Sequence, residues 1–349
     1  MDRIVRALIV DDSAYVRKVV KQILSRSPGI EVVGTARDGI EALELVQQLN
    51  PDVITCDLNM PRMGGCAFVR ELAVRGLVPT IIMSIESESG EEALAALDAG
   101  AVDFVQKPTA LATEKIFEIS EELISKVKAA ADAPVARLRE LPAGSPVDSS
   151  PTAVPQVGTT KVDVVLIGIS TGGPQALKFL IPQLPAYLPV PVVIVMHMPV
   201  GYTEVYARKL DEISLLSVRE ASEGEDVKPG TVILARAGRH LTLRRGTDGR
   251  VLLHLGWSQD DTPHRPSVDV LFQSAAEVYG SRVLGLVMTG MGADGKQGAA
   301  WVKAQGGLIY TEAEETCVVY GMPRSVAESG LSDRSVPLDR MAQAIMETI

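Results

Sequence analysis

Short apolar runs alternate with amphipathic stretches in two separate parts of this chain, and this alternation restricts the fold more than any other feature. The first series occupies residues 1–108, and the second begins at Lys161. A strand buried on both faces needs an apolar run, and an amphipathic helix between two such strands makes a parallel connection. The pattern therefore predicts an α/β chain with two mainly parallel sheets.

The first series predicts five strand–helix units. Helices are expected between the strands, for example over 14–24 and 40–49, and each is followed by a turn signal rich in proline. A last helix is expected over 110–130. The expected strands are Arg6–Val10, Glu31–Ala36, Asp52–Cys56, Thr80–Met83 and Val102–Val105.

The second series predicts a mainly parallel, doubly wound sheet that carries an antiparallel hairpin. The hairpin is expected over 241–255, because residues 244–249 combine basic side chains with glycine and aspartate between two apolar runs. The expected strands are Val162–Ile169, Val192–Met196, Thr231–Leu234, Leu241–Leu243, Val251–Leu255 and Val283–Met288.

The stretch between the two series is rich in proline, serine, glycine and threonine and shows no sustained periodicity from Asp132 to Thr160. Such a composition is typical of a semi-extended linker. We therefore expect domains at 1–130 and 161–349, joined by a linker over 131–160.

Composition argues against several classes of protein. The net charge is −10 without a basic stripe, which disfavours nucleic acid as the partner. No apolar run approaches the roughly 20 residues of a membrane-spanning helix, and the start of the chain lacks the zones of a secretory signal. The three scattered cysteines suit neither a disulfide framework nor a zinc site. We expect a cytoplasmic protein with no membrane insertion.

Charged and polar residues follow four of the expected strands in the first domain: Asp11 and Asp12, then Asp57, Ser84 and Lys107. Ligands of open α/β sheets bind at this edge. Three carboxylates there repel one another unless a cation compensates them, and Mg²⁺ suits such a ligand set. A carboxylate beside Mg²⁺ and an ammonium can accept a phosphoryl group. Each aspartate alone could equally be a turn or N-cap residue.

Three motifs of this domain resemble response-regulator receiver domains: Leu8–Ser13, Asp57–Met63 and Ala99–Pro108. The resemblance implies a flavodoxin-like (βα)5 fold. It also implies that a histidine kinase phosphorylates Asp57, that Asp11 and Asp12 hold Mg²⁺ together with Asp57, and that Ser84 and Lys107 sense the phosphoryl group.

In the second domain, a hydroxyl, an imidazole and a carboxylate follow three expected strands. Ser170 follows 162–169, His197 follows 192–196, and Asp294 lies in the loop after 283–288. Such a set can transfer acyl groups, because the histidine takes the serine proton and the aspartate orients the imidazole. Residues 168–172 also fit G-x-S-x-G, although the order serine, histidine, aspartate differs from that of α/β-hydrolases.

Other interpretations remain open at this point. Residues 290–295 match G-x-G-x-x-G, and Glu312 lies roughly where a ribose-binding acid is expected, which suggests a dinucleotide site. Ser170 could be a helix N-cap, Asp294 a turn residue and His197 a strand-end histidine. The remaining histidines, His240, His254 and His264, are less favourable candidates for a base, because they lie in a basic turn, an apolar run and a polar loop.

The second domain resembles the catalytic domain of chemotaxis protein-glutamate methylesterases. The motifs that carry this resemblance are Gly168–Pro174, Met196–Pro199, Pro266–Phe272, Met288–Gly295 and Tyr320–Arg324. The resemblance implies Ser170 as nucleophile, His197 as base and Asp294 as orienting acid. It places Thr171 and Met291 in the active-site wall, with the Met291 backbone as an oxyanion donor.

The two resemblances together imply a phosphorylation-activated hydrolase in bacterial chemotaxis. The substrates would be glutamate methyl esters on methylated chemoreceptors, with deamidation of receptor glutamines as a second reaction, and ester hydrolysis would need no cofactor. Under this hypothesis the unphosphorylated receiver covers the Ser170 region. The rival classes are a DNA-binding response regulator, a nucleotide-dependent enzyme and a scaffold without catalysis.

Overall fold

The computed structural model describes residues 3–75, 78–84, 90–107, 115–133, 162–257 and 262–349. The chain divides into two compact units, Met1–Glu140 and Leu141–Ile349. The predicted linker lies almost wholly outside the described residues, so its bounds stay a prediction. Within the described residues, no helix is long and apolar enough to cross a membrane.

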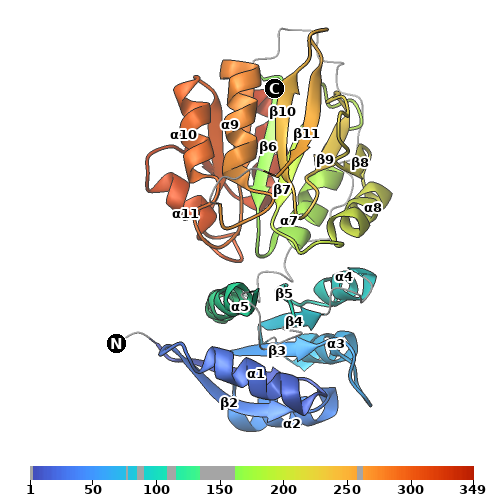
Figure 1. Ribbon diagram of the computed structural model, residues 1–349, viewed down its shortest axis with the longest axis vertical. Coiled ribbons are helices and arrows are strands. Elements are labelled where there is room, and N and C mark those ends of the chain that lie inside the picture. The colour runs from blue at the N-terminus through green and yellow to red at the C-terminus, as the bar shows by residue number, and fades with distance from the viewer. Residues whose placement is uncertain (1–2, 76–77, 85–89, 108–114, 134–161, 258–261) are drawn as a thin grey trace. The chain divides into compact units, whose positions relative to one another are not determined.

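The N-terminal unit contains a parallel sheet in the order β2-β1-β3-β4-β5 (Figure 1). This order is that of flavodoxin-like folds, which confirms the expected fold class. Every strand end lies within one residue of its predicted position, because the apolar runs are short and sharply bounded. The strands are β1 (Val5–Val10), β2 (Ile30–Ala36), β3 (Val53–Asp57), β4 (Thr80–Ser84) and β5 (Asp103–Gln106).

Helices surround this sheet, and two of them begin at a side chain that caps their first N–H groups. The Ser13 hydroxyl accepts a hydrogen bond from the Val16 N–H at the start of α1, and Asp38 caps α2. Helix α1 packs against α5, whereas α2, α3 and α4 pack in sequence. The helices are α1 (Ala14–Leu24), α2 (Gly39–Leu49), α3 (Gly65–Arg75), α4 (Gly90–Asp98) and α5 (Lys115–Ala131).

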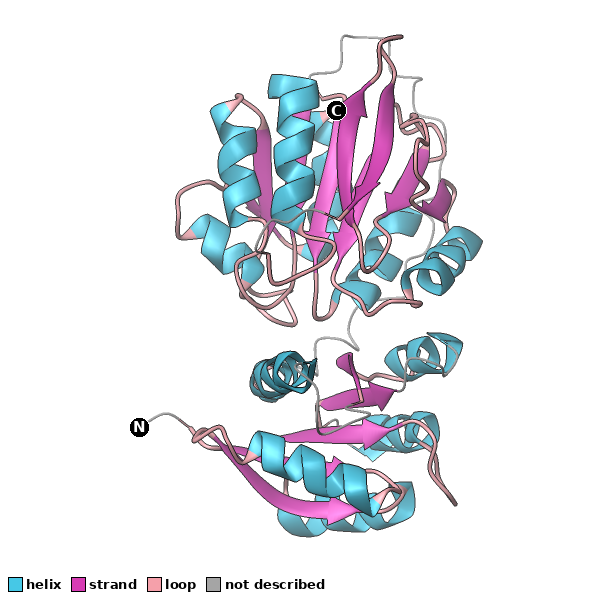
Figure 2. Ribbon diagram, in the orientation of Figure 1, coloured by secondary structure: helices cyan, strands magenta, loops and turns pink. Residues whose placement is uncertain are grey.

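The C-terminal unit contains a seven-stranded sheet in the order β14-β13-β12-β6-β7-β9-β8, and all its neighbouring strands are parallel. Figure 2 shows the strands of this unit in magenta, with helices in cyan beside them. The strand order reverses between β6 and β12, because β7 follows β6 on one side and β13 follows β12 on the other. Ligands of such sheets bind at this switch point. The strands are β6 (Val164–Ile169), β7 (Val192–Met196), β8 (Ser217–Glu220), β9 (Thr231–Leu234), β12 (Val283–Val287), β13 (Leu308–Glu312) and β14 (Arg334–Val336).

The sequence did not predict three of these strands, β8, β13 and β14. Strands β8 and β14 are short edge strands with polar, partly exposed side chains, so they lack an apolar run. Strand β13 ends in Thr311 and Glu312, whose side chains are polar although both residues are buried. Burial of these residues depends on tertiary neighbours that a local pattern does not reveal.

The predicted hairpin is confirmed, and it forms a sheet of its own. Strands β10 (His240–Arg245) and β11 (Val251–Gly256) pair antiparallel, and the Gly246 N–H donates to the Arg250 carbonyl across the turn. Helix α9 packs against β10, β6 and α10. The helices of this unit are α7 (Gly173–Leu180), η1 (Ile181–Gln183), α8 (Thr203–Ile213), α9 (Val268–Tyr279), η2 (Gly280–Arg282), α10 (Lys296–Ala304), α11 (Met322–Ala327) and α12 (Leu338–Thr348).

The contact between β6 and α9 requires a glycine at position 168. A Cβ atom on Gly168 would lie 2.3 Å from Val268 Cγ1, and the Val268 side chain is fully buried. We therefore expect Gly168→Ala to destabilise the C-terminal unit by about 1–3 kcal/mol, as overpacked cores do. Urea unfolding of the full chain would measure the change.

The control for this prediction is Gly256→Ala. A Cβ atom there would meet His254 at an ordinary 3.5 Å, so its midpoint should stay close to that of the wild type. Equal midpoints for the two variants would contradict the packing argument.

Candidate functional site

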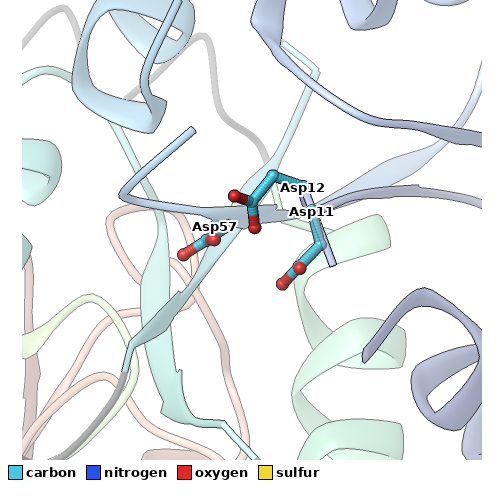
Figure 3. A group of neighbouring side chains, drawn as sticks. All are labelled: Asp11, Asp12 and Asp57. Carbon is cyan, nitrogen blue, oxygen red and sulfur yellow. The ribbon is translucent and has the colours of Figure 1, made fainter. Parts of the chain in front are cut away.

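Three carboxylates meet at the carboxyl ends of β1 and β3 in the N-terminal unit. Asp11, Asp12 and Asp57 each offer an oxygen, and these atoms all lie within 4.8 Å of one another (Figure 3). Asp11 and Asp57 are buried, whereas Asp12 is exposed. The structure thus brings together the residues that the sequence predicted for a cation site, and the site opens to solvent at Asp12.

A buried lysine joins these carboxylates from the end of β5. The Lys107 Nζ lies 2.6 Å from Asp57 Oδ1 and 3.1 Å from Asp11 Oδ2. The Lys107 backbone N–H donates to the carbonyl of buried Ser84 at 2.7 Å, which holds the ends of β4 and β5 together. All five predicted residues of this site therefore lie at one edge of the sheet.

The charges of this site do not balance. Burial raises the pKa of Asp57 to about 6, and burial likewise raises the pKa of Asp11. Burial alone would lower the pKa of Lys107, but the hydrogen bond to Asp57 and the two carboxylate charges raise it. One ammonium compensates three carboxylates only in part, so the site favours a further hard cation with oxygen ligands.

In the C-terminal unit, Ser170 occupies the turn between β6 and α7 at the switch point of the sheet. Its backbone N–H donates to the Thr289 carbonyl at 3.0 Å, and its carbonyl accepts the Gly173 N–H at 2.7 Å. Gly172 makes the turn with a left-handed φ of 80°. A Cβ atom on Gly290 would lie 2.8 Å from Ser170 Cβ, so the loop after β12 lies against this serine.

His197 follows β7, the strand beside β6. Its backbone N–H donates to the carbonyl of Ile169, the residue before Ser170. Its Nε2 lies 2.8 Å from Asp294 Oδ2, and both side chains are less than one-tenth exposed. The three residues that the sequence predicted as a set therefore come from three neighbouring strand ends, and the structure joins two of them by a direct hydrogen bond.

The two ring nitrogens of His197 have different surroundings. Nε2 is engaged by Asp294, whereas Nδ1 is buried and has no hydrogen-bond partner in the part of the chain that the structure describes. Burial would raise the pKa of Asp294, but the hydrogen bond and the charge of His197 hold that pKa well below its usual range. The aspartate thus stays ionised and fixes the imidazole, which leaves Nδ1 for another group.

The loop that carries Met291 and Asp294 is anchored by Thr289. The Thr289 hydroxyl donates to the carbonyl of buried Thr171 at 3.0 Å and accepts the Val318 and Val319 N–H groups at 3.1 and 3.0 Å. These bonds tie the loop to the turn of the serine. Thr171 and Met291, both predicted as wall residues, consequently lie on segments that are joined around Ser170.

Two residues near this site make contacts that the sequence did not predict. The His264 ring stacks on the His197 ring with centroids 4.0 Å apart, although its polar loop gave no sign of this contact. Glu312 is fully buried, and its carboxylate accepts the Thr289 N–H at 2.9 Å and the Thr316 hydroxyl at 3.1 Å. This carboxylate cannot reach a ribose, which removes the acidic residue on which the dinucleotide interpretation depended.

Comparisons with known proteins match both units. A family model described as CheB methylesterase matches residues 165–345, and one described as response regulator receiver domain matches residues 7–119. A Myxococcus xanthus protein named protein-glutamate methylesterase/protein-glutamine glutaminase 5 is 50% identical over 339 residues, which are 97% of this chain and 96% of that protein. The chain belongs to the CheB methylesterase family.

Other relatives support this assignment to the CheB family. A Thermotoga maritima protein named protein-glutamate methylesterase/protein-glutamine glutaminase is 39% identical over 349 residues. The match covers 100% of this chain and 99% of that protein. The crystal structure of the Thermotoga maritima CheB methylesterase catalytic domain is 44% identical, with a TM-score of 0.53 over 54% of this chain and 99% of that chain. The match to that domain agrees with the fold of the C-terminal unit.

The buried Glu312 of this CheB family member predicts a dependence of stability on pH. Burial raises the pKa of Glu312 from 4.5 to about 7. Between these two values the unfolded chain loses the proton while the folded chain keeps it, so wild-type stability falls as pH rises. The loss should reach about 3 kcal/mol above pH 7.

Glu312→Gln removes this titration and keeps an acceptor for the Thr289 N–H. We expect the variant to equal the wild type near pH 5 and to exceed it in unfolding free energy at pH 8, as measured by urea unfolding. The exposed Glu314 lies two residues further on, and Glu314→Gln is the control that should show no such difference. A constant difference between Glu312→Gln and the wild type across this range would contradict the argument.

Proposed function

We propose that this chain hydrolyses methyl esters of glutamate side chains in proteins and deamidates glutamine side chains, with Ser170 as nucleophile, His197 as base and Asp294 as orienting acid. The proposal depends on one observation above all: Asp294 holds Nε2 of His197, while Nδ1 is buried without a partner among the described residues. The names of the relatives supply the two reactions.

In the proposed reaction, His197 Nδ1 takes the proton of the Ser170 hydroxyl as its oxygen attacks the ester carbonyl. Backbone N–H groups of the wall, with Met291 as a donor and Thr171 beside it, stabilise the oxyanion. As the intermediate collapses, the imidazolium protonates the leaving methoxide oxygen, which departs as methanol, or the leaving nitrogen of glutamine, which departs as ammonia. Water attacks the acyl-enzyme by the same route and releases the glutamate. Asp294 stays ionised throughout and stabilises the imidazolium.

The acidic site is proposed as a Mg²⁺-dependent phosphorylation site. Asp11, Asp12 and Asp57 would hold the ion, which neutralises charge on the transferring phosphoryl oxygens. Asp57 would accept the phosphoryl group, and Lys107 would pair with it from β5, beside Ser84. The unbalanced carboxylates of this site, and the raised pKa values of Asp11 and Asp57, support this assignment.

The partners in this proposal are a chemotaxis-type histidine kinase, which phosphorylates Asp57, and methylated chemoreceptors, which are the substrates. The proposed domains are a receiver at 1–130 and a catalytic domain at 161–349, with a linker at 131–160 and a cytoplasmic location.

Methanol release from methylated receptor membranes tests the proposed nucleophile. Ser170→Ala removes the attacking oxygen, so we expect turnover to fall by about 10³-fold or more. Ser329→Ala, a surface serine of the same unit, should release methanol at the wild-type rate. Wild-type methanol release by a folded Ser170→Ala variant would refute the assignment.

Regulation is tested with a small phosphodonor such as acetyl phosphate in the presence of Mg²⁺. We expect methanol release by the wild type to rise on addition of the donor and the rise to be lost in Asp57→Asn, which cannot form the acyl phosphate. Glu44→Gln removes one exposed charge from the same unit and should keep the rise. An undiminished response in Asp57→Asn would show that activation does not pass through this residue.

A further inference from the structure

Helices α9 and α10 begin side by side near Asp294, and neither is capped by the side chain at its own N-cap position. The N-cap of α9 is Ser267, whose hydroxyl makes no cap hydrogen bond, and that of α10 is Gly295, which has no side chain. The first N–H groups of a helix need acceptors from elsewhere in such a case. For each of these helices, the acceptors are provided by the segment at the start of the other helix.

The carboxylate of Asp294, just before α10, supplies the acceptors for α9. Its Oδ2 accepts the Val268 N–H at 2.8 Å, and its Oδ1 accepts the Asp269 N–H at 2.9 Å. The Ser267 hydroxyl also donates to Oδ1 at 2.8 Å. These three hydrogen bonds and the one from His197 fix the position of both oxygens of the Asp294 carboxylate.

The carboxylate of Asp269, in the first turn of α9, supplies the acceptor for the start of α10. One oxygen, Oδ1, accepts the Gly295 N–H at 2.9 Å and the Gly298 N–H at 2.7 Å. Gly295 is the residue next to Asp294. Residue 269 therefore donates to the Asp294 carboxylate through its backbone and fixes the chain beside that carboxylate through its side chain.

Close packing makes this arrangement rigid. A Cβ atom on Gly298 would lie 2.9 Å from the Asp269 Cα, so the two helices touch backbone to backbone at this point. Gly295 has a left-handed φ of 97°, which lets the chain turn into α10 directly after Asp294. A shift of Asp269 would thus move the Asp294 segment.

We propose that Asp269 is a positioning residue for the proposed esterase reaction, which fixes Asp294 and through it the orientation of the His197 imidazole. This inference rests on the proposed function and adds to it. Asp294 alone bonds to the imidazole, and Asp269 acts by holding Gly295 and Gly298. A displacement of catalytic groups by about 1 Å can cost on the order of 10²-fold in rate.

The pKa values of Asp269 and Asp294 are shifted in opposite directions, and the hydrogen bonds of Asp269 indicate which substitution tests its role best. Burial, with the nearby charge of Asp294, raises the pKa of Asp269 to about 6, whereas the pKa of Asp294 is lowered. Because both N–H groups bond to one oxygen of Asp269, an asparagine can offer its single carbonyl oxygen to them. Asp269→Asn therefore keeps the acceptor and removes only the repulsion between the two carboxylates.

The experiment measures kcat and KM for methanol release per active site, counted by titration with an organophosphate. Asp269→Ala should lower kcat about 10- to 100-fold with KM changed less than threefold, and Asp269→Asn should stay within threefold of the wild type. Asp269→Glu keeps the charge but displaces the oxygen, so it should lose kcat as the alanine variant does. If the alanine variant fails to fold, the asparagine and glutamate variants decide the matter.

Asp211→Ala is the matched control, because Asp211 also accepts a backbone N–H, from Val218 at 2.7 Å, in the same unit. It should lose thermal stability without losing kcat. Wild-type kcat in Asp269→Ala or Asp269→Glu, or an equal loss in Asp211→Ala, would overturn the positioning role. Ser170→Ala keeps the outcomes apart: if it abolishes methanol release while Asp269→Ala does not, only this inference fails.

Discussion

The proposed active site of the C-terminal unit depends on the carboxylate of Asp294, which accepts four hydrogen bonds near the start of α9. Donors from His197, Ser267, Val268 and Asp269 surround it. A buried carboxylate without such donors would take up a proton and could no longer orient an imidazole. The packing of α9 against β6 and α10 keeps these donors in place. The same contacts therefore build the core of the unit and position the donors around Asp294.

The two units compensate their buried carboxylates in different ways. In the N-terminal unit three carboxylates meet one ammonium, and Asp57 is left with a raised pKa. The remaining negative charge favours a bound cation at that site. In the C-terminal unit, backbone N–H groups and a histidine satisfy Asp294, so its ionisation does not depend on a ligand. The first arrangement suits the proposed phosphorylation site, and the second suits the proposed catalytic centre.

Much of the site could be predicted from the sequence, because parallel strands bring their carboxyl ends to one edge and the apolar runs that precede Asp57, Ser170 and His197 are distinct. The contacts around these residues could not be predicted. His264 lies in a polar loop, and its ring stacks on His197 only when the fold brings that loop to this histidine. Glu312 resembled a ribose ligand by spacing, yet β13 lies beside β12 and buries its carboxylate under Thr289.

The sequence by itself determined the two α/β units, the hairpin and the residues that face each functional edge, because strand period and strand ends are local properties of the chain. Tertiary structure alone decided which nitrogen of His197 bonds to Asp294, that Lys107 Nζ contacts both Asp11 and Asp57, and which helix each aspartate caps. These outcomes depend on distances of about 3 Å between residues far apart in the chain. Such distances are set by how whole strands and helices pack.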